Sequence, residues 1–358
     1  MSQGLKQIHH IEFVVGNAKQ ASYFYRQGFG FDQVAYRGPE TGCPDRVSYL
    51  LKQNDIGLIL TTPLRHDDPL STWLMLHGDG VRDIAFEVED IEGVYDQAVS
   101  NGARSFCAPK TVSDGQGAIK MAAIHTYGET LHTFVQRDGY DGFLPGFEAA
   151  EIKGRSTGLQ FVDHVVGNLP DRQMEKWVAW YDRTLGLSKF VSYDDKDIST
   201  EYTALRSTVV ASKDRKIKFP LNEPAAGKKK SQIQEYIDAN LTAGVQHLAF
   251  NTDNILETIK ALRENGVDFL PVPEGYYDDV WERVGVVQED KSKVKDLRIL
   301  VDRDDAGYLL QLFTRPLQDR PTFFIEIIQR SGSDSFGKGN FKALFETIEQ
   351  EQTLRGNL

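Results

Sequence analysis

The sequence is poor in cysteine, in long apolar runs and in positive charge, and each shortage excludes a class of protein. Its two cysteines, Cys43 and Cys107, lie far apart, which argues against a disulfide framework and a thiolate zinc site. No run approaches the roughly 20 apolar residues that a membrane-spanning helix needs. Lysine and arginine number 41 against 52 aspartate and glutamate residues, and a formal charge of −11 argues against a nucleic-acid or anionic-membrane surface.

What remains is a cytoplasmic protein with a small-molecule partner. The first residues lack the basic flank and apolar stretch of a signal peptide, and the scarcity of cysteine suits a reducing compartment. At 358 residues, the chain is long enough for two domains that each bury a core.

The sequence contains an internal repeat, and only its second copy carries candidate metal ligands. Three segments recur, aligning Ile11–Asn17 with Val162–Asn168, Gly80–Phe86 with Gly244–Phe250, and Thr133–Arg137 with Glu326–Arg330. In this alignment, three polar residues of the second half match different residues of the first. His164 is aligned with Phe13, His247 with Asp83, and Glu326 with Thr133. The repeat predicts a duplicated scaffold with one working metal site.

Each half repeats a β-α-β-β-β order twice, as judged from alternating and helical apolar patterns. The four helices are predicted at Ala18–Gln27, Ile91–Ser100, Gln173–Leu185 and Ile255–Asn265. The predicted fold class is α+β, with four β-α-β-β-β modules forming two open barrel-like domains of mixed sheet, plus a C-terminal helix. Residues 1–150 are expected to form a non-catalytic domain, and residues 151–358 a metal-binding domain.

The second half is longer because segments are inserted between the candidate ligands. Asn222–Gln234 and Tyr276–Lys295 are polar and charged, and we expect surface loops that border the site. The hinge between the halves is predicted within Gly139–Gly158. Phe341–Gln352 has helical spacing with Asn340 as a possible N-cap, and it has no counterpart in the first half. This helix either caps the site or covers an exposed barrel edge.

The three candidate ligands match a known type of metal centre. Two neutral imidazoles and one carboxylate on one face of an octahedral ion leave three positions open, as in non-haem Fe(II) enzymes that bind a substrate and O2 together. His164, His247 and Glu326 each lie in a strand-like run, and alternation can point all three into one barrel. Burying a lone carboxylate among Phe and Ile costs several kcal/mol, and a cation removes that cost. A zinc site and an extradiol-type dioxygenase fit the same three residues.

Longer motifs narrow the choice. They include DHVVGN at Asp163–Asn168, PLNEPAAGKKKSQIQEY at Pro220–Tyr236, LLQLFTRPLQDRPTFFIEIIQR at Leu309–Arg330, and FGKGNFKALFE at Phe336–Glu346. In these motifs, and over nearly its whole length, the chain resembles the 4-hydroxyphenylpyruvate dioxygenases of the vicinal-oxygen-chelate superfamily. The resemblance implies that His164, His247 and Glu326 hold one Fe(II) per chain. It also implies conversion of 4-hydroxyphenylpyruvate and O2 to homogentisate and CO2 in tyrosine and phenylalanine breakdown.

The resemblance also supplies candidate substrate contacts for a planar phenol. They are Ser207, Asn222, Gln232, Gln246, Gln311, Phe313, Phe324, Phe336, Asn340 and Phe341. Phe324 and Phe341 are expected to sandwich the ring, while Ser207, Asn222 and Gln232 address the phenol hydroxyl. Gln246 precedes a ligand, so a strand bulge or an outer position around the metal is the alternative for it.

Three alternatives stay open at this point. A 4-hydroxymandelate synthase would use the same substrate and metal but hydroxylate the benzylic carbon. A non-catalytic protein could bind a small ligand on the same scaffold. For the third, extradiol ring cleavage, the sequence offers no histidine suited to act as the base beside the metal. The resemblance further implies a homodimer or homotetramer.

Overall fold

Four modules of one strand, one helix and three strands make up most of the computed structural model, which describes residues 4–196 and 198–357. The first module contains β1 (Leu5–Val14), α1 (Ala18–Phe29), β2 (Asp32–Arg37), β3 (Arg46–Gln53) and β4 (Ile56–Pro63). The second contains β5 (Gly80–Val88), α3 (Ile91–Ser100), β6 (Arg104–Asp114), β7 (Gly117–His125) and β8 (Leu131–Gln136). The third contains β10 (Leu159–Asn168), α4 (Met174–Leu185), β11 (Ser188–Tyr193), β12 (Ala204–Ala211) and β13 (Lys218–Ala225). The fourth contains β14 (Gly244–Thr252), α6 (Ile255–Glu264), β15 (Leu300–Arg303), β16 (Tyr308–Phe313) and β17 (Phe324–Ser331).

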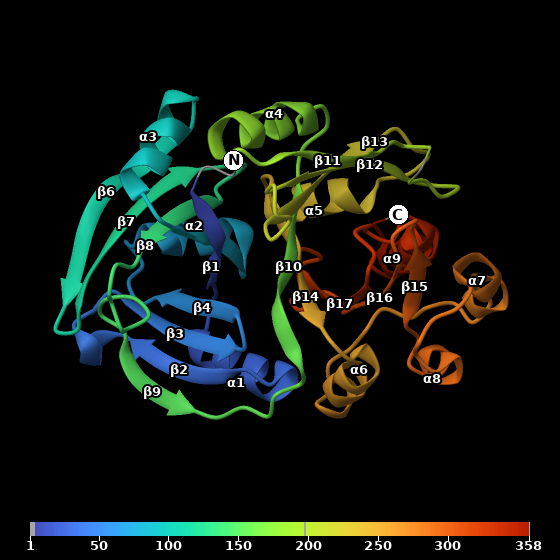
Figure 1. The fold of residues 1–358 in the computed structure, drawn as a ribbon, viewed down its shortest axis with the longest axis horizontal. Helices are drawn as coiled ribbons and strands as arrows, with labels where there is room; N and C mark the ends of the chain where they lie inside the picture. The colour runs from blue at the N-terminus through green and yellow to red at the C-terminus, as the bar shows by residue number, and fades with distance from the viewer. Residues whose placement is uncertain (1–3, 197, 358) are drawn as a thin grey trace.

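The modules pair into two curled mixed sheets that lie side by side (Figure 1), which confirms the predicted fold class. The strand order is β6-β7-β8-β5-β1-β4-β3-β2 in the first sheet and β15-β16-β17-β14-β10-β13-β12-β11 in the second. The two orders are the same when each strand is matched with its equivalent in the other half. The first sheet has one further edge strand, β9 (Glu148–Ile152), which pairs with β2.

Local sequence signals explain where the module helices begin and end. The Asn17 side chain accepts a hydrogen bond from the Gln20 N–H at 3.1 Å at the start of α1. Helix α1 continues past Gly28 and ends at Gly30, whose φ of 77° suits a residue without a Cβ. The prediction that this helix ends at Gln27 was therefore short by two residues, whereas α4 ends at Leu185 as expected.

The two segments predicted as loops in the second half contain regular structure. Asn222 lies within β13, and helix α5 (Gln232–Asn240) begins inside the first segment. The second segment forms α7 (Tyr276–Val284) and most of α8 (Lys291–Asp296). Helix α7 buries Tyr277, Val280 and Val284, a helical spacing that the surrounding charges obscure in the sequence.

The hollow of the first sheet is filled by side chains from residues 140–147, here called the filling segment. Tyr140, Leu144 and Phe147 are buried there against strand residues such as Leu50 and Val135. The filling segment and β9 both fall within the predicted hinge, which is therefore packed structure over much of its length.

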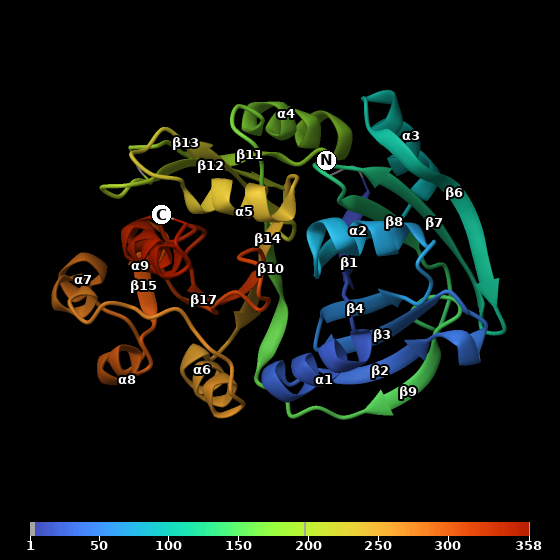
Figure 2. The same cartoon turned by 180° about the vertical axis from the view of Figure 1, so that it is seen from behind.

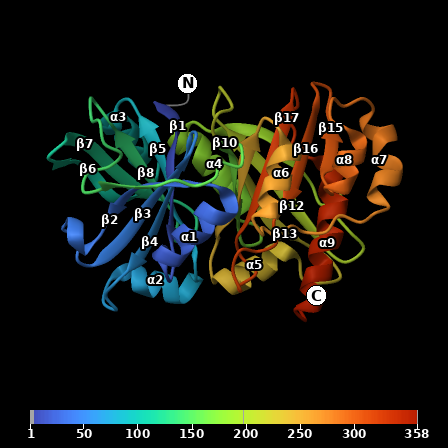
Figure 3. The same cartoon turned by 90° about the horizontal axis from the view of Figure 1, so that it is seen from below.

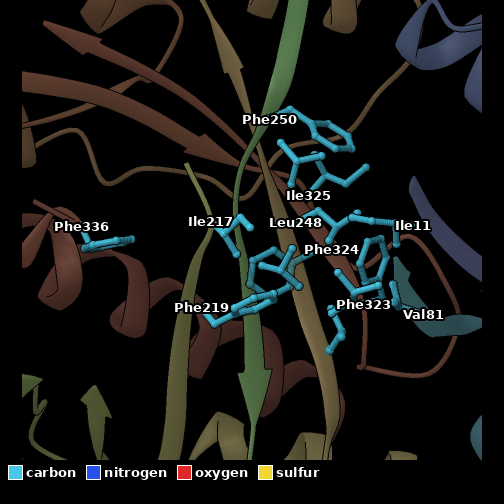
Figure 4. Close-up of a cluster of buried hydrophobic side chains, with 14 of the residues drawn as sticks. Ile11, Val81, Ile217, Phe219, Leu248, Phe250, Phe323, Phe324, Ile325 and Phe336 are labelled. Atoms are coloured by element: carbon cyan, nitrogen blue, oxygen red, sulfur yellow. The ribbon is translucent and has the colours of Figure 1, made fainter. Parts of the chain in front are cut away.

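The two halves share a continuous apolar boundary. The rings of Phe13 and Phe323 meet edge to face, with centroids 5.0 Å apart. Figure 4 shows Ile11 and Val81 of the first half gathered beside Phe323 of the second. Helix α2 (Pro69–His77) also meets α5 there, and the His77 Nδ1 donates to the Asn240 carbonyl at 2.6 Å.

The C-terminal helix α9 (Phe341–Leu354) lies in the opening of the second sheet, with α5 nearby (Figures 2 and 3). Among the residues that the structure describes, no helix enters the first sheet in this way, and the filling segment occupies its hollow. Within the described part of the chain, none of the helices combines the length and apolarity needed to cross a membrane.

Candidate metal centre and substrate cavity

His164, Ala249, Glu326 and Phe313 form one row across four neighbouring strands. His164 pairs with Ala249 across β10 and β14, and Ala249 pairs with Glu326 across β14 and β17. Phe313 of β16 pairs with Glu326 on the far side. Because Ala249 has only a methyl side chain, it leaves room between the imidazole and the carboxylate. His247 lies two residues along β14 and therefore on the same face as Ala249.

The three predicted ligands converge within this row. The Glu326 Oε2 lies 3.3 Å from the His164 Nε2 and 3.4 Å from the His247 Nε2. One donor atom from each residue lies within 4.8 Å of the other two, and all three residues are buried. Among residues 4–196 and 198–357, no other group of three or more His, Cys, Asp or Glu side chains is arranged this way.

The charges around this triangle favour a cation. Burial alone would raise the pKa of Glu326, but the two imidazoles outweigh it and hold that pKa at about 2. Burial lowers the pKa of His247, more than Glu326 raises it. Burial lowers the pKa of His164, but Glu326 and Asp163 outweigh it and raise that pKa. An ionised carboxylate and deprotonated Nε2 atoms are the forms that ligate metals, so a divalent ion would take the place of the proton on His164.

Each imidazole is fixed by a hydrogen bond on its far nitrogen. The His164 Nδ1 donates to the Asp163 carboxylate at 2.7 Å, and the His247 Nδ1 donates to the Gln246 amide oxygen at 3.0 Å. Both bonds leave the Nε2 atoms directed toward Glu326. Gln246 contacts His247 from an outer position and also lines the cavity, so both of its predicted positions fit, whereas sequence reasoning missed Asp163.

A cavity of about 580 Å³ opens from the triangle into the second sheet. Most of the predicted substrate contacts line it, namely Ser207, Asn222, Gln232, Gln246, Phe313, Phe324, Phe336 and Phe341. They come from β12, β13, α5, β14, β16 and β17, from the segment before α9, and from α9 itself. The cavity and the triangle thus form one site inside the second sheet.

Aromatic rings form the cavity wall next to the triangle. Phe324 stacks on His247 with centroids 4.6 Å apart and an interplanar angle of 20°. Phe336 meets His164 edge to face at 5.1 Å. Phe341 contacts Tyr193 in the same way at 5.3 Å, which joins α9 to β11. These rings offer flat apolar surfaces to a planar ligand.

Polar groups lie elsewhere on the wall. Ser207 and Asn222 face one another on the paired strands β12 and β13. The Gln246 Nε2 donates to the Gln232 Oε1 at 3.4 Å. Gln246 therefore contacts both His247 and the amide of Gln232 on the cavity wall. The cavity therefore combines apolar walls with a few fixed polar groups, as small-molecule sites usually do.

Gln311 and Asn340 are not among the residues that line the cavity. Gln311 is buried beneath Gly337, where an added Cβ would lie 2.5 Å from the Gln311 Oε1. Asn340 is fully buried, and its Oδ1 accepts a hydrogen bond from the Tyr276 hydroxyl at 2.6 Å. Asn340 does precede α9 as expected, but its side chain makes no capping bond.

Sequence reasoning missed several apolar lining residues, namely Val166, Tyr193, Ile198, Leu205, Val209, Pro220, Leu344 and Phe345. Two patterns could have revealed some of them. Leu205 and Val209 lie two residues on either side of Ser207, on the same face of β12. Leu344 and Phe345 follow Phe341 at helical spacing. Tyr193 ends β11 and Ile198 lies outside the named strands before β12, and no periodicity marks either residue.

Strand pairing shifts the first repeat segment by three residues relative to the sequence alignment. In β1, Ile8 pairs with Phe86 and His10 with Ala85; in β10, Val162 pairs with Phe250 and His164 with Ala249. The same bulge therefore makes His10, rather than Phe13, the equivalent of His164. Phe13 instead packs against Tyr25 and Phe323 outside the barrel.

In the first half, the residues equivalent to the other two ligands bind each other. The Thr133 N–H donates to the Asp83 Oδ1 at 3.0 Å, and the Thr133 hydroxyl donates to the other carboxylate oxygen. Asp83 is thus satisfied by a neighbouring side chain.

Comparisons with known proteins identify the family and agree with the fold. A family model described as Glyoxalase/Bleomycin resistance protein/Dioxygenase superfamily matches residues 7–134 and 161–312. A Dictyostelium discoideum protein named 4-hydroxyphenylpyruvate dioxygenase is 49% identical, covering 98% of this chain and 99% of its own length. A Caenorhabditis elegans protein of the same name is also 49% identical, covering 98% and 92%. Among solved structures, a mutant of 4-hydroxymandelate synthase from Streptomyces coelicolor aligns with a TM-score of 0.89 and 32% identity, covering 98% and 99%.

Proposed function

The chain belongs to the glyoxalase/bleomycin resistance/dioxygenase superfamily and, within it, to the 4-hydroxyphenylpyruvate dioxygenases, and from this premise we propose its reaction and site residues. It converts 4-hydroxyphenylpyruvate and O2 to homogentisate and CO2, as a cytoplasmic enzyme of tyrosine catabolism. The observation that carries the proposal is the buried triangle of two imidazoles and one carboxylate that opens into an aromatic cavity. One Fe(II) per chain, held by His164, His247 and Glu326, is the proposed cofactor.

The substrate suits both ends of the site. Its 2-oxo acid group carries two adjacent oxygens, and its phenol ring is flat and mostly apolar. When bound, Fe(II) supplies the redox chemistry and the open coordination positions for the 2-oxo acid and O2. The protein must bind the ring, orient it and exclude water.

Aromatic side chains orient the ring in this proposal. Phe324 stacks on a ligand imidazole, so a substrate ring packed on its other face lies close to the metal position. Phe341 belongs to the part of α9 that faces the cavity, and it closes the opposite side. The apolar Leu344 and Phe345 follow it and keep water from the site.

Polar side chains bind the far end of the substrate. Ser207, Asn222 and Gln232 lie on the cavity wall, where they bind the phenol hydroxyl. Asn222 is held by a weak hydrogen bond of 3.5 Å to the Asn168 Oδ1, so its amide can reorient toward a ligand. The positions of Gln311 and Asn340 favour supporting roles under the segment that precedes α9, in place of direct contact.

The two halves have different roles in this proposal. Residues 1–150 form a non-catalytic domain whose hollow is filled, and residues 151–358 form the catalytic domain with its capping helix. The assembled enzyme is a homodimer or homotetramer, which size-exclusion chromatography with light scattering will test.

Product analysis tests the function directly. Purified protein is freed of metal, reloaded anaerobically with Fe(II) or Zn(II), and mixed with 4-hydroxyphenylpyruvate and O2. We expect homogentisate and CO2 in equal amounts with Fe(II), and neither with Zn(II). Hydroxymandelate as the main product would instead assign the activity named for the Streptomyces coelicolor relative. Binding of the substrate without O2 uptake in the Fe(II) sample would favour a non-catalytic binding protein.

A further inference from the structure

Asp163 occupies a bulge next to a proposed metal ligand. Val162 pairs with Phe250 and His164 with Ala249, so Asp163 is the extra residue between two consecutive pairs of β10 and β14. The bulge turns the Asp163 carboxylate toward the neighbouring imidazole, where the Oδ1 accepts from the His164 Nδ1 at 2.7 Å. Asp163 itself does not line the substrate cavity.

Two cations surround the same carboxylate. Arg330 donates from Nε to the Asp163 Oδ2 at 2.8 Å and from Nη2 to the Oδ1 at 2.9 Å. The Lys218 Nζ lies 3.3 Å from the Oδ2. All three side chains are shielded from solvent, with Asp163 only 1% exposed. The bidentate guanidinium and the nearby ammonium give this cluster the geometry of charge-assisted hydrogen bonds to an ionised carboxylate.

Arg330 also connects this cluster to the cavity wall. Its Nη1 donates to the carbonyls of Ser333 and Ser335 at 3.2 and 2.6 Å, which fixes the turn after β17. Its guanidinium lies over the Phe336 ring, 5.3 Å from the centroid. Phe336 in turn meets His164 edge to face at 5.1 Å. Arg330 therefore contacts two side chains that touch His164, the Asp163 carboxylate and the Phe336 ring.

The first half contains the same framework without the carboxylate. Arg137, the equivalent of Arg330, donates to the carbonyls of Tyr140 and Gly142 in the turn after β8. Phe143 follows Arg137 by six residues, as Phe336 follows Arg330, and contacts His10 at 5.6 Å. At the bulge position, however, the first half has His9, whose Nδ1 lies 2.8 Å from the His10 Nδ1. An aspartate is therefore not needed to build the bulge, the turn or the aromatic contact.

We propose that Asp163 is the positioning residue of the metal centre. Its carboxylate holds His164 as the Nδ1–H tautomer with Nε2 toward Glu326, and through Arg330 it holds the turn that carries Phe336. The proposal rests on the metal binding in the proposed function, but not on the identity of the substrate.

The first test uses Asp163→Asn, which preserves shape but removes the charge. Co(II) affinity is measured anaerobically, without substrate, by competition with a chelator. We expect affinity to fall roughly 10–100-fold, as is typical when an outer partner of a ligating histidine is lost. Asp163→Glu, which restores the charge, should recover part of this loss. The matched control is His9→Asn, which alters the same bulge position in the first half and should leave Co(II) affinity unchanged.

A purely structural role would give a different result. In that case Asp163→Asn would lower the unfolding temperature of the metal-free protein, and the folded variant would still bind Co(II) as tightly as the wild type. That outcome would overturn the proposal. A wild-type protein that binds no Co(II) would overturn the metal centre itself, while absence of homogentisate alone would affect only the proposed function.

A second measurement needs no variant at Asp163. In the Zn(II)-loaded wild type labelled with ¹⁵N at histidine, the Nδ1 protons of the two ligands are compared. Because a bond to a carboxylate is stronger than a bond to a neutral amide, the His164 proton should resonate further downfield than that of His247, which donates to Gln246. Equal shifts for the two protons would contradict the anionic partner.

Discussion

Replacing Asp83 by asparagine is expected to stabilise the first half of the molecule at neutral pH. Asp83 is buried on β5, opposite Glu12 of β1, and it accepts two hydrogen bonds from Thr133. Burial raises the pKa of Asp83 to about 6, with Glu12 adding to the rise and Thr133 opposing it. An asparagine of the same shape can accept from the Thr133 N–H and donate to its hydroxyl, so it retains both contacts without a charge.

The size of the effect follows from the pKa difference. A rise in the pKa of Asp83 from the ordinary 3.8 to about 6 means that ionising this carboxyl costs the folded protein about 3 kcal/mol more than it costs the unfolded chain. The folded state binds the Asp83 proton more tightly than the unfolded chain does. The stability that this proton contributes to the wild type is therefore fully present below about pH 4, falls as the pH rises to about 6, and changes no further above that. Asp83→Asn should therefore be more stable than the wild type by about 3 kcal/mol near pH 8, and by less than about 1 kcal/mol near pH 4.

Calorimetry at the two pH values measures this difference, and it also reveals whether the halves unfold in separate transitions. For a transition confined to the first half, the unfolding temperature of Asp83→Asn near pH 8 should rise by about 6 to 12 °C. Asp96→Asn, at an exposed carboxylate of α3, is the control and should shift it little. A gain of the same size at both pH values, or a loss near pH 8, would refute the reasoning.

Four further predictions concern the second half. Glu326→Ala should abolish iron retention and homogentisate formation, because losing a ligand lowers metal affinity by more than the roughly 10–100-fold that losing an outer partner of a ligand costs. A variant that retains iron and activity would contradict the triangle. Ala249→Leu should fill the space between His164 and Glu326, costing about 1–3 kcal/mol of stability by overpacking and preventing Co(II) binding in a protein that calorimetry shows to be folded; normal Co(II) affinity would show that the space is not needed. Gln246→Leu should weaken Co(II) binding roughly 10-fold, because it removes the acceptor of the ligand His247, and an unchanged affinity would assign Gln246 to the substrate alone. Truncation of residues 341–358 should expose the cavity to water, so that CO2 release exceeds homogentisate formation; equal yields of the two products would argue against a role for α9 in coupling.

Apolar periodicity predicted the modules because each module helix and strand buries one face. Helices α3 and α4 lie where their patterns indicated, and the three candidate ligands converge because they lie on the same face of the neighbouring strands β10, β14 and β17. Helix α7 escaped prediction because acidic residues and arginine hide its buried face.

Features that depend on register or on distant contacts were not predictable. The letters VVGN at 14–17 and 165–168 set the sequence alignment, but strand pairing moves β1 by three residues, so it assigns His10 where the alignment assigned Phe13. Asn340 and Gln311 were named by resemblance alone, and their contacts with Tyr276 and the turn at Gly337 join segments far apart in the chain. The pairing of Asp163 with Arg330 spans a similarly long stretch of sequence.

The filling segment shows that the same arrangement of strands can surround either a filled interior or a cavity. Both sheets have the same strand order and the same bulge, yet one encloses Tyr140, Leu144 and Phe147 while the other encloses a chamber. In each half, the segment that follows the last module strand, β8 or β17, fills or closes the interior. Attempts to enlarge or reshape the chamber for bulkier aromatic acids should therefore begin with α9 and the turn before it, where insertions and deletions leave the hydrogen-bonded ladder intact.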